Sequence, residues 1–512
     1  MRLEHVLAGH ALRRPQHVAV VCGAERASYA ELHAAIRRIA GGLHRLGVGP
    51  GDRVLVYLPN GLEFVQLAYA AFTLGAILVP VNTRLTAGEI EHIATDSQPS
   101  VFAFHAASRQ ALAGILAALP GCRALVTGAA AAGEIAFAEL LARGQTDLAP
   151  APLEAEDCMI IYTSGTTGRP KGAVITHAVQ LIQHGYINAV EWGIGAEDRY
   201  LVTTPLAHRT GLGRLTNALC LGGTVVVMEK FDPAQAVEII SAERISILGM
   251  VPTIARMLLP HIERDPDKCS SLRRLIVTGE AFPVELKRRL ISLLPNAQIY
   301  SFFAMTEAGA VTSLGHAEQF THPASVGRPT PGVEIRLIDA AGREVADDEV
   351  GELLVRAGAP GRFITLRAYY NRPQETAAAI RDGWIYTGDL ARRDADGYLY
   401  IVDRKKDMVI SGGLNIYTKE VEQALASHQA VAEAAVIGVP DAVYGEAVAA
   451  FVESKSGISV SAEALIEHCR TLIAGYKKPK YVFFVDALPR NAMGKTLKND
   501  LRRMAAERLA KI

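Results

Sequence analysis

The segment from Tyr162 to Gly172 is dense in groups that bind anions. It reads Tyr-Thr-Ser-Gly-Thr-Thr-Gly-Arg-Pro-Lys-Gly and follows the apolar residues 159–161, which are typical of a buried strand. Its glycines let backbone N–H groups turn toward one point, and its hydroxyl side chains add further donors. Lys171 adds the positive charge that suits a polyphosphate. The segment therefore predicts a phosphate-binding loop, although its composition alone also fits a polar surface turn.

Two common signatures are excluded at this segment. A Walker loop requires Gly-x-x-x-x-Gly-Lys-Ser/Thr, and the spacing from Gly165 to Gly172 does not supply it. A Gly-x-Ser-x-Gly nucleophile elbow around Ser164 would need glycine where the chain has Tyr162. The segment is therefore neither a Walker loop nor a serine-hydrolase motif.

Size and composition indicate a globular enzyme. The 512 residues exceed what one hydrophobic core usually serves, so two or more domains are expected. Half of the residues are hydrophobic and the formal net charge is zero, which gives no indication of a nucleic-acid partner. The six cysteines include no Cys-x-x-Cys pair, which argues against a disulfide scaffold and a zinc site. We expect reduced cysteines and a cytoplasmic location.

The N-terminal part contains one stretch that resembles a membrane span in length. Residues 64–81 carry no charge and are nearly long enough to cross a bilayer. Gly75 and Pro80 divide the stretch, so a buried helix followed by a strand is expected, with no stable membrane insertion. The chain becomes charged directly after Met1, which predicts no secretory signal.

Hydrophobic periodicity predicts alternating helices and strands. Ser28 and Glu31 have the spacing of a capping box, and the apolar residues that follow recur at helical period up to Leu46. The further expected elements are strands at 53–58, 76–79, 275–278, 398–402, 408–410 and 481–485 and helices at 62–74 and 462–473. This alternation predicts an α/β architecture with largely parallel sheets.

Residue for residue, the segment 162–172 resembles the phosphate-binding signature of the adenylate-forming superfamily, which includes acyl-CoA synthetases, peptide-synthetase adenylation domains and firefly-type luciferases. Further motifs of that superfamily follow in order, from about residue 20 to residue 500. The resemblance implies a mixed α/β fold with a large multi-sheet N-terminal domain, residues 1–402, that binds ATP and an acid. A small α+β C-terminal domain, residues 403–512, would be joined by a hinge and carry the catalytic lysine.

The resemblance also implies a set of nucleotide-binding residues. The sequence at 301–307 is similar to the family's Tyr-Gly-x-Thr-Glu, with Phe303 in place of the tyrosine and Ala304 in place of the glycine. Glu307, together with Thr163, would bind Mg²⁺, because carboxylate and hydroxyl oxygens suit this cation. The residues that the resemblance implies for ATP or AMP are Thr163, Ser164, Gly165, Thr166, Thr167, Gly168, Lys171, Gly279, Glu280, Ala281, Phe302, Phe303, Thr306, Asp389 and Arg404.

The segment 204–211 resembles a family motif whose histidine, here His208, lies beside the acyl site. Ala207 stands where an aromatic residue is common, which would widen the pocket, whereas the methyl group of Ala304 would narrow it. Arg209 and Arg214 are expected to be solvated or paired elsewhere, with a second anionic group of the substrate as the alternative. The implied acyl-pocket residues are His208, Gly211, Met250, Ala304 and Met305.

Two C-terminal motifs complete the resemblance. Residues 403–407 resemble the interdomain hinge, and Gly412 and Gly413 resemble the loop that enters the active site when the thiol attacks, so Asp403 and the two glycines are assigned to the hinge and to CoA. Residues 489–495 match the family's Pro-Arg-x-x-x-Gly-Lys, which makes Lys495 the catalytic lysine of the first half-reaction, beside His208 and Glu307.

The implied activity is an AMP-forming acyl- or aryl-CoA ligase that uses ATP, Mg²⁺ and coenzyme A. No carboxylate follows the histidine segment at 211–216, as would be expected for an amino-acid substrate, so a small to medium fatty or aromatic acid is predicted. One alternative is an enzyme that loads a separate acyl carrier protein, and another is a non-catalytic nucleotide-binding regulator. The sequence does not decide the oligomeric state, and a homodimer is left open.

Overall fold

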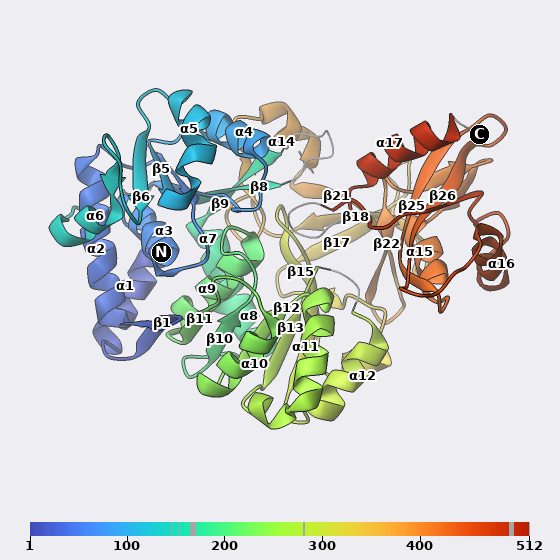
Figure 1. Ribbon diagram of the computed structural model, residues 1–512, viewed down its shortest axis with the longest axis horizontal. Coiled ribbons are helices and arrows are strands. Elements are labelled where there is room, and N and C mark those ends of the chain that lie inside the picture. Colours follow the sequence, from blue (N-terminus) through green and yellow to red (C-terminus); the bar gives the residue numbers. More distant parts are fainter. Residues whose placement is uncertain (145, 153, 164–169, 280–281, 491–495, 511–512) are drawn as a thin grey trace. The chain divides into compact units, whose positions relative to one another are not determined.

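The computed structural model describes residues 1–512 except 145, 153, 164–169, 280–281, 491–495 and 511–512 (Figure 1). The chain divides into two compact units, the first comprising residues 1–335 and 355–385 and the second residues 336–354 and 386–512. The predicted domain boundary, between residues 402 and 403, separates a C-terminal part that would turn about a hinge. The compact units do not test such a movement, so this boundary stays a prediction.

The first sheet of the larger unit has a parallel interior and antiparallel edges. Neighbouring strands run parallel from β14 to β1, whereas β2, β15 and β16 are antiparallel to their partners. In spatial order the sheet comprises β16 (Arg328–Pro329), β15 (Gly309–Leu314), β14 (Gln298–Met305), β13 (Arg274–Val277), β12 (Ile247–Met250), β10 (Arg199–Val202), β11 (Thr224–Val227), β1 (Val18–Cys22) and β2 (Glu25–Ser28).

The second sheet of this unit is also mainly parallel, with an antiparallel β8–β9 hairpin that carries the predicted phosphate loop. Its spatial order is β19 (Ala368–Tyr369), β9 (Lys171–Thr176), β8 (Asp157–Thr163), β4 (Ile77–Pro80), β3 (Arg53–Tyr57), β5 (Val101–His105), β6 (Arg123–Thr127) and β7 (Ile135–Ala136).

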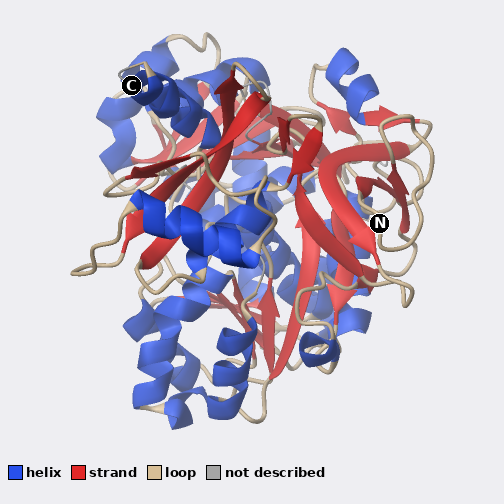
Figure 2. Ribbon diagram, turned by 90° about the vertical axis from the view of Figure 1, so that its right-hand side faces the viewer, coloured by secondary structure: helices blue, strands red, loops and turns tan. Residues whose placement is uncertain are grey.

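Helices enclose these strands (Figure 2). α10 (Pro233–Ala242), α11 (Pro252–Arg264) and α12 (Val284–Leu293) bury apolar side chains against the first sheet. α4 (Ala87–Ser97) and α5 (Arg109–Ala117) do the same against the second. The other helices of the unit are α1 (Leu3–Arg13), α2 (Tyr29–Arg45), α3 (Leu62–Leu74), α6 (Phe137–Arg143), α7 (His177–Gln180), α8 (Asn188–Trp192), α9 (Arg209–Leu221), α13 (Glu318–Thr321) and α14 (Pro373–Ala379), with short turns η1 (Ala106–Ser108), η2 (Leu181–Ile187) and η3 (Pro266–Cys269).

The predicted N-terminal elements are present. The hydroxyl of Ser28 accepts the backbone N–H of Glu31, and the Glu31 carboxylate accepts the backbone N–H of Ser28, which forms the predicted capping box of α2. The apolar stretch 64–81 is divided between α3 and β4, as expected. Among the described residues, no helix has the length and apolar character needed to cross a membrane.

The remaining strands form two further sheets. One has the order β17 (Glu334–Ile338), β18 (Gly351–Arg356), β21 (Trp384–Arg393) and β20 (Ile380–Arg381), with β22 (Leu399–Arg404) paired to β21. The other, within the smaller unit, has the order β24 (Leu414–Ile416), β23 (Val409–Ser411), β26 (Gly445–Ser454) and β25 (Val431–Asp441), with β27 (Tyr481–Phe484) paired to β26.

The sheet of the smaller unit is covered by helices on both faces. α15 (Thr418–Ala426) and α16 (Ala462–Leu472) share one apolar cluster with it, and α17 (Lys498–Leu509) shares a second cluster that contains Phe451. The mixed α/β class, with a large multi-sheet part and a smaller α+β part, is confirmed.

The capping box of α2 can be tested by Ser28→Ala. The substitution leaves the backbone N–H of Glu31 without its side-chain acceptor, so the free energy of unfolding should fall by about 1 kcal/mol. Urea denaturation followed by circular dichroism measures the change. Ser108→Ala is the matched control, because Ser108 stands at the N-cap of α5 without a side-chain cap bond and should change stability much less. Equal losses in the two variants would contradict the prediction.

Candidate active site

The β8–β9 hairpin fixes the two ends of the predicted phosphate loop. Thr163, the last residue of β8, pairs with Lys171, the first residue of β9. Ser164, Gly165, Thr166, Thr167 and Gly168 lie outside the described residues, so their contacts with phosphate stay predictions. The hairpin nevertheless brings a hydroxyl and a cation to the same end of the second sheet.

Glu307 is the point at which the two sheets of the larger unit meet. It lies in the turn between β14 and β15 of the first sheet, and its backbone C=O accepts the N–H of Leu366 at 2.8 Å. Its Oε1 atom accepts the hydroxyl of Thr163 at 3.4 Å and the hydroxyl of Tyr369 at 3.0 Å. Three oxygen atoms from three separate segments therefore converge.

These oxygen atoms suit a hard divalent cation, because Mg²⁺ binds carboxylate, hydroxyl and phosphate oxygens. Among the described residues, no group of three or more His, Cys, Asp or Glu side chains could hold a metal by itself. A cation at Glu307 would therefore need phosphate oxygens or water to complete its ligands, which is the pattern for Mg²⁺ that arrives with a nucleotide.

Tyr369 is a site residue that the sequence analysis did not identify. Burial and the adjacent Glu307 carboxylate raise the pKa of its phenol, so the group stays a neutral donor at physiological pH. The Nζ atom of Lys171 lies 5.4 Å from the centre of its ring. The local sequence holds no signal for this role, because the role depends on the long-range pairing of Tyr369 with Ala173.

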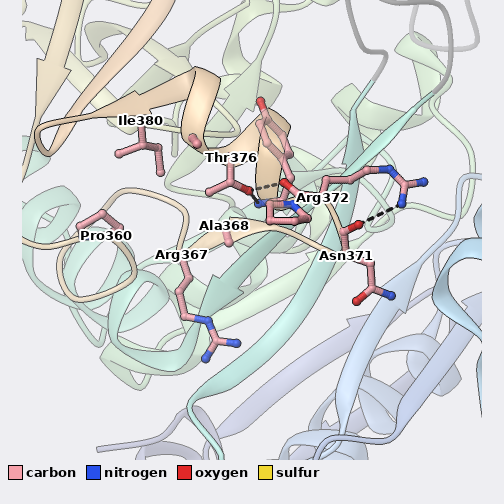
Figure 3. A pocket seen from close by; sticks show the side chains of 10 residues that line it. Pro360, Arg367, Ala368, Asn371, Arg372, Thr376 and Ile380 are labelled. Atoms are coloured by element: carbon pink, nitrogen blue, oxygen red, sulfur yellow. Dashed lines mark hydrogen bonds between the residues drawn. The ribbon is translucent and has the colours of Figure 1, made fainter.

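A hollow opens beside Tyr369 (Figure 3). Arg367, Asn371 and Arg372 contribute to its wall, and the hydroxyl of Thr376 accepts the backbone N–H of Tyr369 at 2.9 Å. The wall therefore combines two arginines and one amide with apolar groups such as Pro360 and Ile380, and Tyr369 connects it to Glu307.

The strand that leads into the loop is anchored by a partly buried acid, Asp96. The hydroxyl of Tyr162 donates to Oδ2 of Asp96 at 2.7 Å, and Nη2 of Arg372 donates to Oδ1 of the same carboxylate at 2.5 Å. Asp96 belongs to α4 and Arg372 follows β19, so two distant segments hold the end of β8 in place.

His208 stands at the N-cap of α9 and is neutral. Burial, and then the positive charge of Arg209, lower its pKa to about 4. Its Nδ1 atom accepts the backbone N–H of Thr210 at 3.2 Å, which leaves the ring hydrogen on Nε2. His208 can therefore offer a neutral N–H donor to an acid, whereas it does not bring a positive charge.

Arg209 is buried, with 7% of its surface exposed, and is paired within the chain, so the prediction that it is solvated or paired elsewhere is confirmed. Its guanidinium donates to the backbone C=O groups of Met305 and Thr306, directly before Glu307. It also donates to the side chain of Gln183 at 3.1 Å. Arg209 thus fixes the turn that presents Glu307, and we class it as a positioning residue.

Arg214 is also buried, with 4% of its surface exposed, so it is not solvated. Its Nε and Nη2 atoms have no hydrogen-bond partner within the part of the chain that the structure describes, so the predicted pairing is not seen at these two atoms. Burial lowers its pKa to about 10, which leaves it charged at neutral pH.

The residues predicted around adenine and acid lie near the ends of the central strands. Gly279 follows β13 and has a backbone φ of 100°. Residues other than glycine adopt this backbone conformation only with strain. Phe302 and Phe303 are neighbours in β14 and project to opposite faces. Met250 ends β12, Ala304 and Met305 end β14, and Thr306 precedes Glu307. Glu280 and Ala281 lie outside the described residues.

Gly211 has a packing role that the sequence did not reveal. A Cβ atom at this position would collide with the backbone of Pro205, so the absence of a side chain lets α9 approach the preceding loop. Its predicted contact with the acyl group stays a prediction.

The predicted residues of the smaller unit form their own network. Nε of Arg404 lies 2.6 Å from Oδ1 of the buried Asp389, across the β21–β22 pair. The carboxylate of Asp403 accepts the hydroxyl of Thr418 at 2.9 Å and the backbone N–H of Thr418 at the start of α15. The negative charge suits that helix terminus. Lys495 lies outside the described residues.

Gly412 and Gly413 form the turn between β23 and β24 with φ of 57° and 80°. The N–H of Gly412 donates to the C=O of Tyr444 at 2.8 Å. Glycine is favoured at both positions because left-handed backbone is strained for other residues.

Comparison with known proteins identifies the class. Residues 7–365 match the AMP-binding enzyme family, and residues 420–495 match the AMP-binding enzyme C-terminal domain. The chain therefore belongs to the AMP-binding enzyme family, and it is an acid–thiol ligase of the AMP-forming acyl-CoA synthetase branch.

Individual relatives cover nearly the whole chain. It is 37% identical to a feruloyl-CoA synthase from Amycolatopsis sp, over 96% of either chain. It is 36% identical to the long-chain-fatty-acid–CoA ligase FadD13 from Mycobacterium tuberculosis, over 93% of either chain. Among solved structures, o-succinylbenzoate CoA synthetase (MenE) from Bacillus subtilis, in complex with the acyl-adenylate intermediate OSB-AMP, is similar with a TM-score of 0.86, 30% identity and coverage of 97% of both chains.

Arg209→Met tests the positioning role. It removes the donors to the carbonyls before Glu307, so kcat should fall roughly 10- to 100-fold, as small misplacements of catalytic groups do. The Mg²⁺ concentration for half-maximal activity should rise, and KM for the acid should change little. Arg209→Lys should restore part of the loss, and Arg256→Met, at an exposed position of α11, is the control. If the variant shows a lower melting temperature but unchanged kcat and Mg²⁺ response, Arg209 contributes to stability only and the positioning role is wrong.

The lowered pKa of His184 predicts that the folded protein loses stability in mild acid. Burial, followed by the charges of Arg209 and Arg214, lowers its pKa from 6.5 to about 3. Below pH 6.5 the unfolded chain binds this proton and the folded protein does not, so stability falls as the pH decreases. At pH 5 the contribution is about 2 kcal/mol, since each pH unit is worth about 1.4 kcal/mol.

The measurement is the change in unfolding free energy between pH 7 and pH 5, compared with that of His184→Gln. Wild type should lose about 2 kcal/mol more than this variant. His44→Gln, at an exposed histidine, should behave like wild type. Parallel curves for wild type and His184→Gln would contradict the assignment.

Proposed function

We propose that the enzyme converts a carboxylic acid, ATP and CoA into acyl-CoA, AMP and pyrophosphate by way of an acyl-adenylate. The proposal depends on one observation. Thr163 and Lys171, on either side of the segment 164–169, are paired with each other, and Thr163 donates to the carboxylate of Glu307. An oxygen ligand for a cation, a hydroxyl donor and a lysine at one place suit a nucleoside triphosphate.

In the first step, an oxygen of the acid attacks the α-phosphorus of ATP. A phosphorus–oxygen bond forms to the acid, the bond between the α-phosphorus and the bridging oxygen breaks, and pyrophosphate leaves with that electron pair. Two anions must approach each other, so catalysis is mainly positioning and neutralisation of charge. Lys171 and, from the resemblance, Lys495 would supply positive charge, and the segment 163–168 would hold the departing pyrophosphate.

Mg²⁺ would be held by Glu307 and Thr163, and it supplies positive charge against the phosphate oxygens when bound. The hydroxyl of Tyr369 donates to Glu307 at 3.0 Å and so keeps the carboxylate turned toward the end of β8. Arg209 keeps the turn of Glu307 in place from the other side.

The acid would bind beside His208 at the start of α9. A neutral imidazole there can donate to the carboxylate without holding it as tightly as a cation would, which leaves its oxygen nucleophilic. The names of the relatives, a feruloyl-CoA synthase and a long-chain-fatty-acid–CoA ligase, support an aromatic or fatty acid. We propose a small to medium acid, with Met250, Ala304 and Met305 in the pocket wall.

In the second step, the thiolate of CoA attacks the acyl carbon and AMP leaves with the carbon–oxygen bond pair. We propose that residues 403–512 turn about Asp403, which withdraws Lys495 and admits Gly412 and Gly413. Asp389 and Arg404 would bind the ribose and neighbouring parts of the nucleotide. We further place the enzyme in the cytoplasm, and a homodimer is compatible with the proposal.

A second acceptor is the main alternative to CoA. An enzyme that loads an acyl carrier protein would perform the same first step and differ only in the thiol that it accepts. The relatives' names, which specify CoA, favour the ligase.

The experiment supplies purified protein with ATP, Mg²⁺ and CoA and a panel of acids that includes acetate, hexanoate, decanoate, benzoate and ferulate. AMP, pyrophosphate and thioester are quantified separately. CoA-dependent AMP release with one group of acids supports the ligase. Pyrophosphate release without a CoA thioester supports the carrier-protein alternative, and no release with any acid contradicts an adenylating enzyme.

Two variants separate the half-reactions. Lys495→Ala should slow acyl-adenylate formation by about 10²- to 10³-fold, as the loss of one electrostatic contact to a transition state does. The same variant should still convert supplied acyl-adenylate and CoA into thioester. Glu307→Gln should raise the Mg²⁺ requirement. Equal loss of both half-reactions in Lys495→Ala would contradict the assigned role.

A further inference from the structure

Arg214 lies inside the larger unit with two aromatic rings packed against its guanidinium. It belongs to the buried face of α9, six residues after His208. Its guanidinium carbon is 5.4 Å from the centre of the Trp192 ring and 5.6 Å from that of Phe302. These two rings are themselves 5.2 Å apart. The rings attract the cation, but they do not accept its in-plane N–H hydrogens.

The two unpartnered nitrogens of Arg214 form one edge of the guanidinium. Nε and Nη2 carry parallel N–H bonds, which is the arrangement that binds a carboxylate through two hydrogen bonds. Neither nitrogen has a hydrogen-bond partner among the described residues. The free edge therefore matches a planar anion.

Other unpartnered groups in this region are also donors. The indole Nε1–H of Trp192 and the hydroxyl of Tyr200 are buried without a partner in the described part of the chain. Tyr200 lies close enough for the charge of Arg214 to lower the pKa of its phenol, although burial raises that pKa more strongly. The indole can only donate and the hydroxyl can donate or accept, so an anion, which supplies acceptors, would satisfy this region.

The neighbouring strand has a glycine that makes room for this arginine. A Cβ atom at Gly249, in the interior of β12, would collide with Nε of Arg214. Glycine weakens a strand interior and often marks a close approach by another group. The strand thus accommodates a guanidinium that nothing in the described structure neutralises.

The energetic imbalance points to a missing acceptor. Removing a cation from water without a counter-ion is costly, and leaving buried donors unpaired adds about 1–3 kcal/mol for each group. Arg209, on the same helix, avoids this cost because backbone carbonyls and Gln183 accept its hydrogens. Arg214 has no such acceptors, so its cost would be offset by a group that arrives with the substrate.

We propose that Arg214 is a specificity residue that binds a second carboxylate, at the end of the acid remote from the reacting carboxylate. This inference rests on the proposed function, since it takes the acid to bind beside His208. Within the small to medium acids of the proposed function, it selects those that carry a second carboxylate. The chemistry of the first step is unchanged, because only one of the two carboxylates reaches the nucleotide.

The position of Arg214 limits the length of the acid. Six residues of α-helix advance about 9 Å from His208, and long side chains on a helix lean back toward its N-terminus. The two carboxylates should therefore be separated by a distance on the order of 9 Å. Short and medium dicarboxylates fit this limit, and long-chain ones exceed it.

The test compares each dicarboxylate with its own neutral counterpart. Succinate, glutarate, adipate and pimelate are assayed for ATP- and CoA-dependent AMP release beside their monomethyl esters and the monocarboxylates of equal chain length. Wild type should prefer at least one dicarboxylate to its monomethyl ester by about 30-fold in kcat/KM, as expected for a charge-assisted contact. This comparison requires no variant.

Arg214→Met supplies the second arm, because methionine is apolar and of similar reach. It should lower kcat/KM for the preferred dicarboxylate by about 30-fold or more and leave the corresponding monomethyl ester unchanged or improved. The loss should appear mainly in KM. Arg214→Lys, which keeps the charge without the paired edge, should recover part of the activity, and Arg288→Met, at an exposed position of α12, is the control.

The outcomes are distinguishable from failure of the proposed function. If wild type activates monocarboxylates or monomethyl esters as well as dicarboxylates, the enzyme is a ligase and the role of Arg214 is wrong. If wild type prefers dicarboxylates but Arg214→Met keeps the same preference, another residue binds the second carboxylate and the proposal is overturned. If no acid yields AMP or pyrophosphate, the proposed function itself fails.

Discussion

The candidate site depends on one carboxylate held by hydroxyl groups from another sheet. Glu307 belongs to a turn of the first sheet, while Thr163 and Tyr369, which donate to it, belong to the second. A carboxylate oxygen that accepts two hydrogen bonds has a defined direction, and this direction relates the end of the phosphate segment to the strands predicted to flank adenine. Each sheet alone would leave the site incomplete.

The two buried arginines of α9 illustrate how a similar placement leads to different roles. Arg209 is satisfied by backbone carbonyls around Glu307, so its charge contributes to the internal order of the site. Arg214 is held by aromatic faces and keeps two donors unpaired. The first arrangement is that of a positioning group, and the second is that of a group whose acceptor comes from outside the chain.

In the smaller unit, two buried acidic side chains have partners within the chain. The carboxylate of Asp389 is paired with Arg404, and that of Asp403 is used at the start of α15. Both acids are buried, where an unpaired charge would be costly. These contacts fix the backbone on either side of the β21–β22 pair, in the segment that the resemblance connects with the nucleotide and the hinge.

The sequence by itself determined the local elements and the class of chemistry. Helix α2 with its capping box, the division of residues 64–81 and the strand that leads into the phosphate segment all follow from short-range patterns of apolar, glycine and capping residues. The ordered motifs were sufficient to identify the family, because their residue types are required by the chemistry at closely defined spacings.

Only the tertiary structure decided which distant groups meet. Tyr369 reaches Glu307 through a strand pairing across nearly two hundred positions of the chain, and no local pattern encodes such a pairing. The sequence likewise could not distinguish Arg209 from Arg214, since both are arginines in one short segment. Their difference arises from what surrounds each guanidinium, carbonyl oxygens in one case and aromatic rings in the other, and burial makes that difference large because water cannot replace a missing partner.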